Sequence, residues 1–157
     1  MIRTKGRLRL CVTLLVLNLI FIWGNSLLPG YVSGAISDGV KNILAMLLPA
    51  GPQGPSVGGG LLRKLAHFTE FTCLGLLLSW LFRMLRQRNW EHLLLPFVCG
   101  VCTAALDETI QMFVPDRGPG IKDVGIDTLG VLLGIVIISL KQLNKNKKIK
   151  NLEEKSL

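Results

Sequence analysis

The sequence predicts an all-α integral membrane protein, built as a four-helix bundle with an additional amphipathic helix on its outer surface. Half of the 157 residues are hydrophobic and only 18% are charged, a balance that is unusual for a soluble domain of this size. Four apolar stretches are long enough to cross a bilayer, which takes about 20 helical residues. The ionisable residues of these stretches gather near their ends.

The four predicted spans cover residues 8–28, 65–82, 93–113 and 124–140. The first span follows several basic residues, as the core of a secretory signal peptide does. However, its apolar run is long for a signal core, and three more spans follow. We therefore expect the first span to be an uncleaved transmembrane helix.

The segment between the first and second spans divides into two parts. Apolar residues recur at helical spacing between residues 32 and 48, which predicts an amphipathic helix lying flat in the outer headgroup layer. Residues 49–60 are rich in proline and glycine and predict a non-helical linker. The linker is either a passive connector or a hinge that lets the flat helix move as a lid.

The distribution of basic residues predicts the orientation in the membrane. They gather before the first span, between the second and third spans, and after the fourth. An even number of crossings places these groups on one side, and cytoplasmic segments carry an excess of lysine and arginine. We therefore expect a multi-pass cell-membrane protein with both termini cytoplasmic. Residues 1–140 form the transmembrane domain, and residues 141–157 form a basic cytoplasmic tail that is disordered at its end.

The net charge of +8 does not require a nucleic-acid partner, because retention on the cytoplasmic side and attraction to anionic membrane lipids account for it. No nucleic-acid partner is predicted. Assembly of the four helices as a homo-oligomer around the polar cluster described next is left open.

A cluster of polar and ionisable residues lies at the opposite, outer level of the spans. Each charge at a helix centre costs about 2.5–3.5 kcal/mol on insertion scales, so these groups are expected to face one another or to line a wet cavity. The spacing of three or four residues within each span places its members on one helix face. The predicted ligand-binding residues are Lys64, His67, Glu70, Asp107, Glu108, Gln111, Arg117, Asp123 and Asp127.

The first functional hypothesis is an outward-facing pocket that binds without catalysis. Lys64 and Arg117 suit a phosphate or a carboxylate, while the acids and Gln111 accept hydrogen bonds from hydroxyl or amino groups. The expected partners are membrane lipids, a lipid-linked cell-wall intermediate or a glycopeptide. A polar network that serves folding alone is the structural alternative.

The alternative function is an intramembrane hydrolase or transferase acting on a lipid-linked envelope intermediate. In that case His67 is the candidate general base, and Asp107 or Glu108 is the candidate acid. No serine or cysteine nucleophile pairs recognisably with the histidine. No cofactor is predicted, although a divalent cation on His67, Glu70, Asp107 and Asp123 is left open, because imidazole and carboxylates suit such ions.

Three segments of the last three spans resemble the VanZ-like family of small membrane proteins, named for an accessory protein associated with teicoplanin resistance. They are KLAHFTEFTCLG (64–75), DETIQMFVPDR (107–117) and DVGIDTLGVLLG (123–134). The chain departs from the family pattern at Arg63, where an acidic residue is frequent, and at Asp127, where asparagine is common. The resemblance implies a bacterial cell-membrane protein linked to envelope or antibiotic-resistance phenotypes, and it implies no chemical mechanism.

Overall fold

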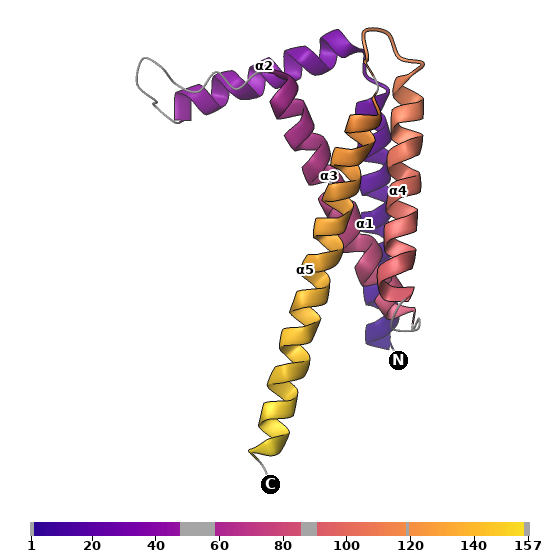
Figure 1. Ribbon diagram of the computed structural model, residues 1–157, viewed down its shortest axis with the longest axis vertical. Coiled ribbons are helices and arrows are strands. Elements are labelled where there is room, and N and C mark those ends of the chain that lie inside the picture. Colours follow the sequence, from indigo (N-terminus) through magenta and orange to yellow (C-terminus); the bar gives the residue numbers. More distant parts are fainter. Residues whose placement is uncertain (1, 48–58, 86–90, 119, 156–157) are drawn as a thin grey trace.

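The computed structural model describes residues 2–47, 59–85, 91–118 and 120–155, which form five α-helices and no strands. The helices are α1 (Ile2–Ser26), α2 (Gly30–Leu47), α3 (Gly59–Met84), α4 (Glu91–Gln111) and α5 (Ile121–Glu154). Helices α1, α3, α4 and α5 form a bundle, and α2 branches away at the end opposite to both termini (Figure 1).

The four bundle helices are each long and apolar enough to cross a membrane. Many of their large apolar side chains are exposed, among them Ile20, Phe21 and Leu129. In a water-soluble protein such exposure would mark an interaction surface, whereas in a membrane-spanning bundle it is the surface expected to face lipid. The predicted all-α membrane bundle is therefore confirmed.

The helix ends differ from the prediction in three places. Helix α4 ends at Gln111, two residues before the predicted end of the third span, and a turn follows it. Helix α5 continues to Glu154. The basic tail, which was predicted to be disordered at its end, is therefore helical as far as Glu154, because lysine is a good helix former. The predicted linker was wrong for Gly59 and Gly60, which belong to α3, and its other residues lie outside the described residues.

Helix α2 matches the predicted amphipathic helix closely and runs across the end of the bundle (Figure 1). Its first residue is fixed to the loop between α4 and α5, since the Gly30 N–H donates to the carbonyl of Pro115 at 3.0 Å. A Cβ atom at Gly30 would lie 1.7 Å from the Asp116 carbonyl oxygen, so only glycine fits there. The resulting orientation is the one expected of a helix lying in the headgroup layer.

The closest helix packing joins α3 to α5. Cβ atoms placed on Gly130 and Gly134 would lie 2.6 Å and 2.4 Å from the backbone oxygens of Phe68 and Thr72, and one on Gly75 would meet the Val131 oxygen at 2.3 Å. Small residues spaced four apart allow such backbone contact between transmembrane helices. This packing fixes the start of α5 against the start of α3, where most of the polar residues lie.

We predict that Gly134→Ala destabilises the protein, although alanine favours a helix over glycine by about 1 kcal/mol. The added methyl group would collide with the backbone of α3, and overpacking of this kind costs about 1–3 kcal/mol. Thermal unfolding of detergent-purified protein measures the effect. Gly125→Ala, on the same helix with open space around it, is the matched control and should be neutral or stabilising. Equal melting temperatures for the two variants would contradict the prediction.

Candidate functional site

A polar cluster lies inside the bundle at the end where α2 branches off. Its central residues are His67 on α3, Asp107 on α4 and Asp127 on α5. At about 1.5 Å per helical residue, these positions lie roughly 6–11 Å from the nearest ends of the spans at Gly60, Gln111 and Ile121. The cluster is therefore at the same depth on all three helices.

Asp107 is completely buried and its carboxylate is held by two neighbours. The Ser26 hydroxyl donates to Oδ1 at 2.6 Å, and the Gln111 side-chain amide donates to Oδ2 at 2.9 Å. The Arg63 guanidinium in turn donates to Gln111 Oε1 at 2.8 Å. These bonds join α1, α3 and α4, and they satisfy both oxygens of a carboxylate that would otherwise be costly to bury.

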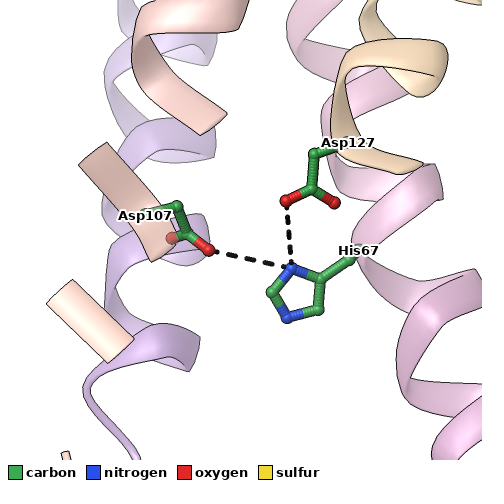
Figure 2. A group of neighbouring side chains, drawn as sticks. All are labelled: His67, Asp107 and Asp127. Carbon is green, nitrogen blue, oxygen red and sulfur yellow. Dashed lines mark ion pairs between the residues drawn. The ribbon is translucent and has the colours of Figure 1, made fainter. Parts of the chain in front are cut away.

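His67 lies between two buried carboxylates. Its Nδ1 atom is 3.7 Å from Asp127 Oδ2 and 3.8 Å from Asp107 Oδ2, and its side chain is 12% exposed (Figure 2). Both distances are too long for hydrogen bonds. Neither oxygen of Asp127 has a hydrogen-bond partner among the described residues. The side chains thus point at one another across a small gap.

The remaining acids of the cluster have partners of their own. Glu70 Oε1 accepts a hydrogen bond of 2.8 Å from the Asn25 amide. Glu108 Oε2 accepts one of 2.9 Å from the backbone N–H of Gly120, at the start of α5. Lys64 and Asp123 form an ion pair of 3.6 Å near the surface, and an exposed pair of this kind contributes at most about 1 kcal/mol.

Arg117, in the loop between α4 and α5, reaches over the end of α1. Its Nε atom donates to the Leu28 carbonyl at 2.9 Å, and Nη2 donates to the Asn25 carbonyl. A cation that bonds the last carbonyls of a helix also interacts favourably with the helix dipole. Burial, followed by the positive charge of Arg63, lowers the pKa of Arg117 from its ordinary value, but a guanidinium keeps its charge in proteins.

A cavity of about 270 Å³ opens beside the cluster. Six of the nine predicted ligand-binding residues line it, whereas Glu70, Asp107 and Arg117 are not among its lining residues. The six are Lys64, His67, Glu108, Gln111, Asp123 and Asp127. That these nine residues contact a ligand remains a prediction.

Sequence reasoning missed Arg63, which also lines the cavity. Its spacing of four residues from His67 would have placed it on the same face of α3. Sequence reasoning also did not identify Asn25 and Ser26, at the end of α1, as partners of the acids. Nothing in the sequence pairs them with Asp107 and Glu70, because those contacts join different helices.

Four apolar helices, three of which line a polar cavity, define a multi-pass membrane protein with a candidate site for a small charged ligand. The chain belongs to the VanZ/LLP1 family, whose model matches residues 9–142. This match covers most of α1 and α5 and everything between them, and it confirms the resemblance seen in the sequence. No curated protein and no solved structure matches the chain.

We predict that Arg117→Lys lowers the thermal stability of the protein, because a lysine ammonium does not reproduce the fork that spans two carbonyls. The loss of a hydrogen bond to a charged group costs about 1.5–3 kcal/mol. Thermal unfolding measures the change, with Lys122→Arg, at an exposed position in the first turn of α5, as the control. An unchanged melting temperature would refute the structural role of this arginine.

Proposed function

We propose that this chain is a cell-membrane protein that binds the anionic headgroup of an envelope lipid and thereby modulates susceptibility to glycopeptides of the teicoplanin type. The observation that carries the proposal is a cavity inside a membrane-spanning bundle with two cationic side chains, Arg63 and Lys64, in its wall. Basic side chains are costly at this depth unless a negative charge meets them.

The charge of Arg63 supports binding of an anion. Its guanidinium is bonded to the neutral amide oxygen of Gln111, and no carboxylate lies within ion-pair distance of it in the described part of the chain. A guanidinium presents several donors in a planar fork that matches a phosphate. Lys64, half exposed and paired with Asp123 at 3.6 Å, is the second basic side chain in the cavity wall.

The size of the cavity favours a headgroup over a larger ligand. A volume of about 270 Å³ is close to the lower end of small-molecule pockets, roughly 300–1,000 Å³. A phosphate with an attached hydroxyl or amine matches this volume, while a whole glycopeptide is far larger. Glu108, Asp123 and Asp127 offer acceptors to such hydroxyl or amino groups. The acyl or prenyl chain of the lipid would remain in the bilayer.

The arrangement of charges supports an outward-facing cavity with cytoplasmic termini. Both termini lie at one end of the bundle, and the cavity residues belong to the other end (Figure 1). The lysine-rich part of α5 and the basic N-terminus share an end, and the tendency of basic segments to stay in the cytoplasm supports a cavity on the outer side. A pocket there would hold lipid-linked cell-wall intermediates at the surface where glycopeptides act.

The contacts of His67 favour a second candidate, an intramembrane hydrolase or transferase. A neighbouring carboxylate can orient a histidine that acts as a general base, and this imidazole has two buried carboxylates beside it. The nearby Ser26 hydroxyl donates to Asp107, and no serine or cysteine bonds to His67 among the described residues. The attacking group would therefore be a water molecule or a second substrate. Turnover of a labelled lipid-linked intermediate by purified protein would support this candidate.

We predict that Arg63→Gln and Lys64→Gln each weaken headgroup binding about tenfold or more, as expected when a charge-assisted hydrogen bond of about 1.5–3 kcal/mol is lost. Binding of short-chain phosphatidylglycerol and of a lipid-linked cell-wall precursor to the purified chain measures the effect and separates the two sources of phosphate. In expressing bacteria, both variants should reduce any protection against teicoplanin.

Lys145→Gln, on the exposed extension of α5, removes the same charge far from the cavity and is the matched control. Membrane abundance is measured in parallel. Unaltered lipid binding in both cavity variants would refute the proposal, and a parallel fall in abundance and phenotype would instead indicate a folding role.

A further inference from the structure

We propose that His67, Asp107 and Asp127 form a centre for one divalent transition-metal ion, Zn²⁺ or Mn²⁺, and that this ion also contacts the anionic headgroup. The second half of the statement rests on the proposed function, whereas metal binding by the three side chains does not. The ligands come from α3, α4 and α5 and converge on one point (Figure 2).

The spacing of the donor atoms suits a shared ion. One donor atom from each of the three residues lies within 4.8 Å of the other two, and His67 Nδ1 is 3.7 and 3.8 Å from the two carboxylates. Donor atoms that surround one ion tetrahedrally at about 2.0–2.2 Å lie roughly 3.2–3.6 Å apart. The two distances from His67 exceed this spacing by only a few tenths of an ångström, and a donor oxygen of Asp107 lies within 4.8 Å of one of Asp127. The gaps are too long for direct hydrogen bonds.

Asp127 supplies an independent indication that a ligand belongs here. Its side chain is 1% exposed, yet neither carboxylate oxygen receives a hydrogen bond within the described ranges. A buried carboxylate that receives no hydrogen bond is costly and calls for an explanation, even with His67 at ion-pair distance. The carboxylate points at His67 and also lines the cavity (Figure 2), so an ion between Asp127 and His67 would satisfy it.

The charge balance also favours a cation. Two buried carboxylates beside a neutral imidazole carry a charge of −2, and protonation of the imidazole leaves −1. A divalent ion beside the two carboxylates and a neutral imidazole brings the net charge of the centre to zero. This favours the ion, because a buried net charge is strongly disfavoured. One nitrogen and two carboxylate donors suit Zn²⁺ and Mn²⁺ better than ions that take oxygen ligands alone.

The surroundings of Asp107 resemble the support that metal ligands require. Ser26 and Gln111 each donate to one of its oxygens, which fixes the orientation of the carboxylate, as residues behind metal ligands commonly do. Three protein ligands leave a coordination position open. His67 and Asp127 line the cavity together with Arg63 and Lys64. One oxygen of a bound phosphate would therefore reach the open coordination position of the ion, while Arg63 and Lys64 hold the other phosphate oxygens.

The structure selects a different ligand set from the one that the sequence left open. Glu70 is bonded to Asn25, and Asp123 is paired with Lys64 near the surface. Asp127 replaces these two acids in the ligand set, because the close packing of α5 on α3 brings Asp127 next to His67. This selection makes Glu70→Gln a matched control, since it removes a carboxylate from the same cluster outside the metal set and outside the cavity.

The test uses the purified full chain, stripped with a chelator and titrated with Zn²⁺ by calorimetry and with Mn²⁺ by electron paramagnetic resonance. We expect one ion per chain, a tenfold or greater loss of affinity in Asp127→Asn, and a much smaller loss in Glu70→Gln, which removes a nearby negative charge but no ligand of the ion. Asp127→Asn keeps the side-chain shape and removes no hydrogen bond, so the fold is retained. Absence of binding by the unaltered chain, or equal affinity in Asp127→Asn, would overturn the metal centre.

Binding of short-chain phosphatidylglycerol to the stripped and metal-loaded chain separates the two proposals. A tenfold gain on metal loading supports the coupling. Headgroup binding without any metal binding overturns only the metal centre. Metal binding without headgroup binding in either form leaves the metal centre in place and overturns the proposed function. Equal headgroup affinity in both forms refutes the contact between the ion and the headgroup.

Discussion

The constraint on which the structure depends is the burial of charge inside an apolar bundle. Asp107 and Asp127 are fully buried, and His67 is nearly so, where hydration is lost and any uncompensated charge is costly. Three of the spanning helices place groups against the buried carboxylates: α1 supplies Ser26, α4 supplies Gln111, and α3 supplies His67. The helices are thus tied together at this end by polar contacts and at mid-depth by apolar packing around Phe71 and Val131.

Backbone contact between α3 and α5 converts this constraint into a defined geometry. Gly130 and Gly134 allow the two helices to touch over a full turn, and Asp127 lies one turn before Gly130. A larger side chain in the contact would separate the helices and move Asp127 away from His67. The spacing of these glycines therefore determines both how closely α5 packs on α3 and the distance between His67 and Asp127.

The sequence was sufficient for the features that depend on one helix at a time. Span length, the amphipathic character of α2 and the shared depth of the acids all follow from apolar pattern and spacing. It was insufficient for contacts between helices, which depend on rotation about each helix axis. For this reason the bonds of Arg117 to the carbonyls of Asn25 and Leu28 were not foreseen, and Arg63 was overlooked. The length of α5 was also missed, because lysine-rich segments are compatible with both helix and disorder.

The hydrogen bonds divide the cluster into two groups, and this division bears on whether it serves folding alone. Asp107 has both carboxylate oxygens bonded to other parts of the chain, as a member of a folding network should. Glu70 and Arg117 also bond other parts of the chain, although Glu70 Oε2 and Arg117 Nη1 have no hydrogen-bond partner among the described residues. Asp127 receives no hydrogen bond in the described structure and Arg63 meets no carboxylate there, yet both line the cavity. A network selected only for folding would lose stability through such unmatched groups. Unmatched groups of opposite charge around one cavity are better explained by a ligand that carries both a cationic and an anionic part, or by an ion and an anion bound together.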